Sequence, residues 1–173
     1  MLAGDDLARA IVKAAYLEGD FTLSSGQKSR YYLDKFRFST DPALLAPIAD
    51  GLASLLPPGL DRLAGVELGA VPLVTAVALR TGLPFVIVRK SAKEYGTSKL
   101  IEGVLEPGAR VALIEDVLTT AGQAIRAAQM LSELGARVEK VVYVVDREQG
   151  ADANIRAAGF DPAALFTKTS LGI

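Results

Sequence analysis

Residues 111–123 read VALIEDVLTTAGQ, and their pattern is the strongest indication of the architecture. The four apolar residues 111–114 predict a buried strand, which the adjacent acids Glu115 and Asp116 follow. A short turn of threonines and small residues then leads into a helix predicted over 121–134. A short, fully apolar strand followed by an amphipathic helix is typical of a parallel sheet that helices cover. The segment therefore predicts an α/β fold.

The same alternation of apolar strand and amphipathic helix runs along most of the chain. Because such units wind a parallel sheet between helices, we expect a doubly wound, mainly parallel α/β sheet with helices on both faces. Residues 20–41 break the pattern and predict a loop, a short strand and a second loop. The other predicted strands are 63–68, 85–88 and 141–145, and the other predicted helices are 5–18, 42–56, 72–81 and 151–158.

Length and composition predict one domain over residues 1–173. Half of the residues are hydrophobic and 23% are charged, which is enough apolar material for an ordinary core. Within that domain we expect an N-terminal helix and substrate hood over 1–40 and the α/β core over 41–173. Residues 90–108 lack periodicity, and a loop of that length in a compact domain is usually functional or mobile.

Composition also excludes several kinds of chemistry. The chain has no cysteine, histidine or tryptophan, so disulfides, thiol catalysis, histidine acid–base catalysis and cysteine–histidine zinc sites are excluded. Any metal would be a hard, oxygen-bound ion such as Mg²⁺. A net charge of −1 argues against a broad nucleic-acid surface. No run approaches the roughly 20 apolar residues of a membrane span, and the first residues lack a basic signal region, so we expect a cytoplasmic protein.

The turn after the 111–114 strand predicts a phosphate site. Ligands of open α/β sheets lie at the carboxyl ends of the strands, and a helix N-terminus with small residues offers free N–H groups to an anion. The hydroxyls of Thr119 and Thr120 can add donors. Glu115 and Asp116 would repel a phosphate that touched them, but they suit a ligand that also carries hydroxyls, such as a sugar phosphate. The alternative is a plain strand end with an acidic helix cap.

A second candidate is the run of basic residues that begins the 90–108 loop. Arg89, Lys90, Lys93 and Lys99 place four cations within eleven residues of a nearly neutral chain. Such a loop can close over a polyanion, exclude water and stabilise negative charge on a leaving group. The alternative is a solvated charged loop.

Two further strand ends carry candidate binding groups. Arg147 follows the 141–145 strand and can hold a carboxylate through two hydrogen bonds; the alternative is an ion pair with a neighbouring acid. The turn 67–72, ELGAVP, follows another strand, and its small residues would let backbone N–H groups approach a pyrophosphate. No lysine lies between Arg62 and Arg80, so a plain strand-to-helix turn is a serious alternative there.

Three of these segments together resemble one family. Residues 111–123 resemble the phosphoribosyl-pyrophosphate (PRPP) signature of type I phosphoribosyltransferases. Residues 21–34, FTLSSGQKSRYYLD, are similar to the N-terminal substrate loop of orotate phosphoribosyltransferases, and residues 89–103 resemble the mobile catalytic loop of that family. The signature alone would indicate only the superfamily, whereas the three segments in this order are typical of the orotate enzymes. The resemblance covers about residues 21–150.

The resemblance assigns roles to individual residues. It leaves open whether Tyr31 and Tyr32 stack on the base or belong to a core strand, and whether Ser24 or Lys28 contacts substrate. It implies no direct metal ligand. The implied PRPP residues are Arg89, Lys90, Lys93, Tyr95, Glu115, Asp116, Thr119, Thr120, Ala121, Gly122 and Gln123; the orotate residues are Thr119, Arg147, Tyr31 and Tyr32; and the catalytic residues are Lys93, Glu115 and Asp116.

The resemblance also implies a reaction and partners. Orotate and PRPP would give orotidine 5′-phosphate and pyrophosphate in UMP synthesis, with Mg²⁺ held mainly by substrate and water. The enzyme would be a homodimer in which the loop 90–108 completes the site of the neighbouring subunit. Two alternatives remain: a phosphoribosyltransferase for another base, such as a purine, and a PRPP-sensing regulator without activity. Arg147 and the 21–34 loop argue against the first, and the lack of a basic face argues against the second.

Overall fold

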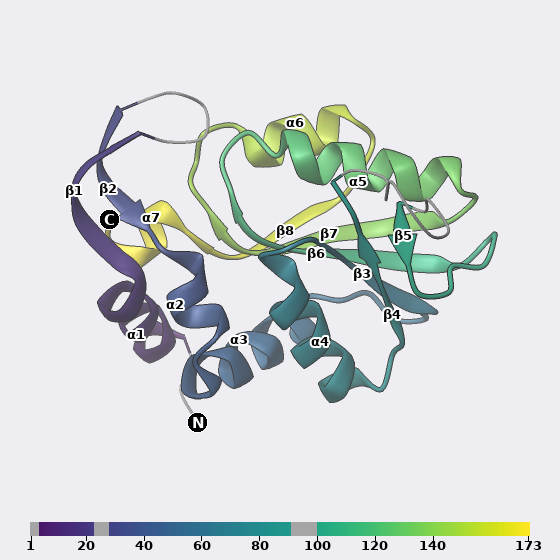
Figure 1. Cartoon of the computed structure of the whole chain (residues 1–173), viewed down its shortest axis with the longest axis horizontal. Coiled ribbons are helices and arrows are strands. Elements are labelled where there is room, and N and C mark those ends of the chain that lie inside the picture. Colours follow the sequence, from purple (N-terminus) through teal and green to yellow (C-terminus); the bar gives the residue numbers. More distant parts are fainter. Residues whose placement is uncertain (1–3, 23–27, 91–99) are drawn as a thin grey trace.

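A computed structural model describes residues 4–22, 28–90 and 100–173 (Figure 1). Its centre is a six-stranded sheet with the order β5-β4-β3-β6-β7-β8. Every neighbouring pair is parallel except β4 and β5, which are antiparallel. The mainly parallel sheet predicted from the sequence is thus confirmed. The strands are β3 (Arg62–Val66), β4 (Phe85–Val88), β5 (Ile101–Glu102), β6 (Arg110–Leu118), β7 (Arg137–Asp146) and β8 (Pro162–Thr167).

Helices cover both faces of this sheet, as the doubly wound prediction requires (Figure 1). α1 (Asp5–Ala15), α3 (Pro42–Ser54) and α4 (Ala70–Thr81) pack one apolar cluster against one face. α5 (Gly122–Glu133) and α6 (Ala151–Ala157) pack a second cluster against the other. β6 serves both, since Ala112 and Ile114 belong to the first cluster and Val111 and Leu113 to the second.

The N-terminal part differs from the prediction. The helix predicted over 5–18 ends at Ala15, and the chain turns into the hairpin of β1 (Tyr16–Thr22) and β2 (Lys28–Leu33). Tyr16 pairs with Leu33 across this hairpin, so non-local strand pairing overrides the local helical periodicity. Within 20–41 the predicted short strand is confirmed as β2, but residues 20–22 belong to β1 and residues 35–39 form α2 (Lys35–Ser39), which Asp34 caps.

In the rest of the chain, the structure differs from the prediction at the ends of elements and at the edge strands of the sheet. β6 continues to Leu118 because its parallel pairing with β7 extends that far, so Glu115 and Asp116 lie inside the strand and not after it. α4 begins at Ala70, two residues before its prediction. The edge strands β5 and β8 and the short helix α7 (Lys168–Leu171) were not predicted. No helix in the described part of the chain is long and apolar enough to span a membrane.

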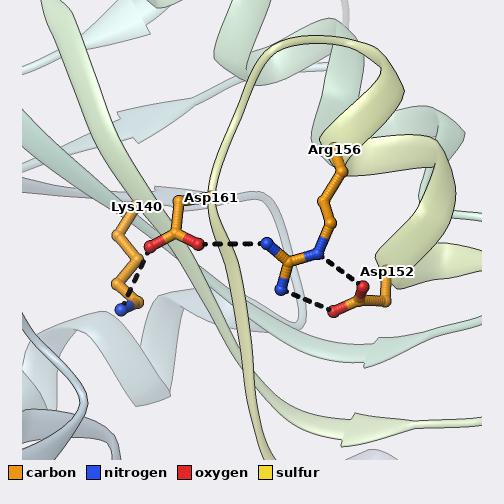
Figure 2. A network of polar contacts seen from close by, with 4 residues as sticks. All are labelled: Lys140, Asp152, Arg156 and Asp161. Atoms are coloured by element: carbon orange, nitrogen blue, oxygen red, sulfur yellow. Dashed lines mark hydrogen bonds and ion pairs between the residues drawn. The ribbon is translucent and has the colours of Figure 1, made fainter.

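A polar network joins α6 to β7 and to Asp161, the residue that precedes β8 (Figure 2). Arg156 lies between two acids, with Nε 2.8 Å from Oδ2 of Asp152 and Nη1 3.5 Å from Oδ1 of Asp161. Asp161 also lies 3.2 Å from Nζ of Lys140 on β7. Exposed pairs of this kind contribute little individually, because water and salt screen them. The position of these pairs matters more than their strength, because Arg156 lies on α6, the helix that carries Asn154, and Asn154 contacts the candidate site.

Candidate active site

A cavity of about 670 Å³ opens at the carboxyl ends of β3, β6 and β7. This is the edge of an open α/β sheet at which ligands bind. The hairpin and α2 lie on its other side, so the site is formed between the sheet and the N-terminal hood. The lining residues are Thr22, Tyr32, Leu33, Lys35, Val66, Glu67, Gly69, Lys90, all of 115–124, Arg126 and Arg147.

The two adjacent acids of β6 are buried, with exposed fractions of 6% for Glu115 and 4% for Asp116. Oδ2 of Asp116 lies 2.7 Å from Nζ of Lys35, and Oδ1 accepts a hydrogen bond from the Val117 amide at 2.5 Å. Burial, with the nearby charge of Asp116, raises the pKa of Glu115 to about 8, and Lys35 and Lys90 only partly oppose this. Asp116 is thus paired with Lys35, while burial favours the protonated form of Glu115, which can donate a hydrogen bond.

The turn between β6 and α5 forms an anion cradle, which we define as residues 119–123. Ala121 has a left-handed φ of 62° and precedes the first turn of α5, which no described side chain caps. The free N–H groups of this first turn of α5 thus border the cavity, as an anion site requires. Nδ2 of Asn154 on α6 donates to the Thr120 carbonyl at 3.0 Å and holds the cradle in place.

Arg126 is a cation of this cradle that the sequence analysis missed. It lines the cavity, and its Nη1 would lie 3.8 Å from a Cβ placed on Gly122, one helical turn earlier. That i, i+4 spacing was the available signal, since residues four apart share a helix face.

Arg147 directly follows β7 and is buried, with an exposed fraction of 7%. Its amide donates to the Leu118 carbonyl at 2.9 Å, and its guanidinium lies 4.8 Å from the ring centre of Tyr31. Within the described chain its Nε has no hydrogen-bond partner, and neither adjacent acid pairs with it. Because buried polar groups are nearly always hydrogen-bonded, this guanidinium is suited to an anionic ligand.

The two tyrosines of β2 point to opposite faces, as alternation along a strand requires. Tyr32 lines the cavity, whereas Tyr31 stacks on Tyr16 with ring centres 5.4 Å apart and does not line it. Lys28 donates to the Thr22 hydroxyl at 2.9 Å and does not line it either.

The basic residues that precede the long loop contact the 67–72 turn. Nη1 of Arg89 lies 3.8 Å from Glu67 and 3.7 Å from Glu102, so this arginine lies among acids and outside the cavity lining. The amide of Lys90 donates to Glu67 Oε1 at 2.6 Å, and Lys90 itself lines the cavity. Four residues named in the sequence analysis, Ser24, Lys93, Tyr95 and Lys99, lie outside the described residues.

Lys35 and Gly69 also belong to the site; Gly69 lies in the predicted 67–72 turn, whereas nothing in the sequence indicated Lys35. The backbone of Gly69 passes so close to Asp116 that an added Cβ would lie 1.8 Å from Oδ2 and 2.9 Å from Nζ of Lys35. Only glycine fits there without a shift of the acid. No local pattern signals these contacts, because the three residues come from separate elements.

A mainly parallel α/β sheet with an anion cradle beside two buried acids of the preceding strand defines the class of type I phosphoribosyltransferases. No family model matches the chain. The orotate phosphoribosyltransferase of Methanocella arvoryzae is 48% identical over 153 residues, covering 88% of this chain and 87% of that protein. That of Natronomonas pharaonis is 46% identical over 171 residues, covering 98% of both.

Solved structures give the same result. The crystal structure of Mycobacterium tuberculosis orotate phosphoribosyltransferase in complex with PRPP matches with a TM-score of 0.82 and 31% identity, covering 98% of both chains. The chain belongs to the orotate phosphoribosyltransferase family.

Proposed function

We propose that the chain transfers the 5-phosphoribosyl group of PRPP to orotate, giving orotidine 5′-phosphate and pyrophosphate. One observation carries this proposal: a single cavity contains an uncapped helix N-terminus at residues 119–123 and a buried Arg147 whose Nε lacks a partner among the described residues. The first suits a phosphate monoester, and the second suits a carboxylate. Orotate and PRPP carry one each.

In this arrangement the cradle binds the 5-phosphate, with the Thr119 and Thr120 hydroxyls and Arg126 as further donors. Glu115 and Asp116 form hydrogen bonds with the ribose hydroxyls. Arg147 holds the orotate carboxylate, and Thr119 contacts the base from the other side. The burial of both acids supports this, because hydrogen bonds to sugar hydroxyls are strongest where water is excluded.

The reaction breaks the bond between C1 of the ribose and the diphosphate oxygen, and forms a bond from C1 to a ring nitrogen of orotate. That nitrogen gives up its proton to the leaving diphosphate or to water. Positive charge builds on the ribose ring meanwhile, and a nearby carboxylate stabilises it. Negative charge builds on the leaving diphosphate, where Lys90 lines the cavity and Arg89 lies close behind. By the family resemblance Lys93, outside the described residues, is the main catalytic cation. Positioning and electrostatics carry the rate, since the chain has no histidine.

Mg²⁺ fits this site as an ion carried by the substrate. No cluster of three potential ligand side chains occurs within the residues that the structure describes. Glu115 and Asp116 both line the cavity, and would hold the ion through the ribose hydroxyls that they bind. When bound, Mg²⁺ neutralises charge on the diphosphate.

We also propose that the protein is a cytoplasmic homodimer in which the 90–108 loop serves the partner's site. The family resemblance supports this proposal, and such an interface would cover exposed apolar side chains such as Leu79 on α4, which is 83% exposed, or Val104, which is 62% exposed. If the loop acts in the partner's site, mixing Lys93→Ala and Arg147→Met proteins restores up to about a quarter of wild-type turnover, because half of randomly exchanged dimers contain one intact site. No recovery after exchange would contradict the shared site.

The central test is pyrophosphate release from PRPP and Mg²⁺ with orotate, adenine, guanine or hypoxanthine as the base. Of the four bases, we expect only orotate to give pyrophosphate release. In Arg147→Met the KM for orotate should rise at least tenfold, while the Kd for PRPP stays unchanged. Release with a purine would support the other-base alternative. PRPP binding without release for any base would support the regulator.

A further inference from the structure

Lys35 connects three parts of the molecule at the cavity. It is the first residue of α2 in the hood, and its ammonium reaches the carboxylate of Asp116 on β6 at 2.7 Å. The same nitrogen lies over the 67–72 turn, 2.9 Å from where a Cβ on Gly69 would stand. The side chain lines the cavity and is about one-third exposed, at 32%.

The contacts of Asp116 fix this ammonium in place. Oδ1 of Asp116 is held by the Val117 amide, and the Gly69 backbone closes over Oδ2. An ammonium has three N–H donors, and the ion pair with Asp116 uses one of them. Because Lys35 lines the cavity, the other two are available to a ligand there.

The 67–72 turn needs such a cation. It contains no basic residue, and it contributes the acid Glu67, which lines the cavity with Glu115 and Asp116. A diphosphate that entered the turn would meet these carboxyl groups. Nη1 of Arg89 lies 3.8 Å from Glu67, but Arg89 does not line the cavity, so it balances the charge of Glu67 from outside the cavity. Lys35 is a cation on the cavity side, above the glycine backbone.

We propose that Lys35 supplies, beside Lys90, a side-chain cation for the diphosphate of PRPP, because the 67–72 turn itself lacks one, and that Asp116 and Gly69 hold the ammonium in position. The inference rests on the proposed function and adds a binding residue to it. It also makes α2 part of the pyrophosphate site, so that the hood contacts the leaving group as well as the cavity wall.

The test compares three ligands, each titrated with Mg²⁺ into wild-type and Lys35→Met protein by calorimetry: PRPP, pyrophosphate and ribose 5-phosphate. We expect Lys35→Met to weaken PRPP and pyrophosphate binding tenfold or more and to change the Kd of ribose 5-phosphate less than twofold, because that sugar lacks the diphosphate. Lys35→Arg should restore part of the loss. Lys13→Met, which removes an exposed lysine of α1 outside the cavity lining, is the matched control and should change none of the three.

The other outcomes separate this inference from the proposed function. Equal weakening of all three ligands would overturn it, because Lys35 would then act only by positioning Asp116 against the ribose. Unchanged Kd values in Lys35→Met would also overturn it. Wild-type protein that binds no PRPP would refute the proposed function itself. Should Lys35→Met unfold at the assay temperature, Lys35→Gln makes the same comparison.

Discussion

Two turns of this molecule follow parallel strands and open helices, yet they are built differently. The cradle after β6 is formed by one continuous segment, with backbone N–H groups of α5 and Arg126 one turn further on. The turn after β3 is assembled from distant parts: Gly69 supplies the backbone, Lys35 comes from the hood, and Lys90 donates an amide to Glu67. A phosphate monoester site can thus be local, whereas the diphosphate end depends on the whole fold.

The largest expected effect concerns the chemistry at the diphosphate end. Lys93→Ala should lower kcat by about a thousandfold or more while the Kd for PRPP stays within a few-fold, because a cation at the leaving oxygens acts mainly in the transition state. Single-turnover kinetics and PRPP titration check this together. Unchanged turnover would remove Lys93 from the mechanism.

The second prediction uses the two glycines as a matched pair. Gly69→Ala should lower the free energy of unfolding by about 2 kcal/mol or more, because its Cβ would collide with the Asp116 carboxylate. Gly122→Ala has no atom closer than 3.8 Å and should be neutral or stabilising by up to about 1 kcal/mol. Urea unfolding of both variants measures the difference. A loss of stability in Gly69→Ala as small as that in Gly122→Ala would mean that the 67–72 turn is not tightly packed against Asp116.

These two turns also show what the sequence can predict. The cradle was predictable because its strand, turn and helix start are contiguous in 111–123, and the sheet followed from the same pattern. The hairpin was not, since Tyr16 leaves the helix only because it pairs with Leu33. Lys35 was not predictable either: its partner Asp116 is remote in sequence, and no local periodicity marks a tertiary ion pair.

A third prediction concerns pH and the buried acid pair. The folded-state pKa of Glu115, about 8, lies above its ordinary value of 4.5, so the folded protein keeps a proton that the unfolded chain loses. The free energy of unfolding should therefore fall as pH rises from 5 to 8, by at most about 1.4 kcal/mol per pH unit. Glu115→Gln should remove most of this slope. Parallel slopes in wild type and variant would show that Glu115 is charged throughout.

The smallest expected effect is at the cradle. Arg126→Met should weaken ribose 5-phosphate binding by about three- to tenfold and leave pyrophosphate binding unchanged, since the helix N–H groups remain. This is the opposite ligand pattern to that of Lys35→Met. If Arg126→Met instead weakened pyrophosphate binding, the two ends of the site would be assigned the wrong way round.

The most direct measurement is a crystal structure of the protein with PRPP and Mg²⁺. We expect the 5-phosphate within hydrogen-bond distance of the amides of 120–123, and the diphosphate at the 67–69 turn beside Lys35. A phosphate monoester at the 67–69 turn, or PRPP bound away from the β6–α5 cradle, would contradict it.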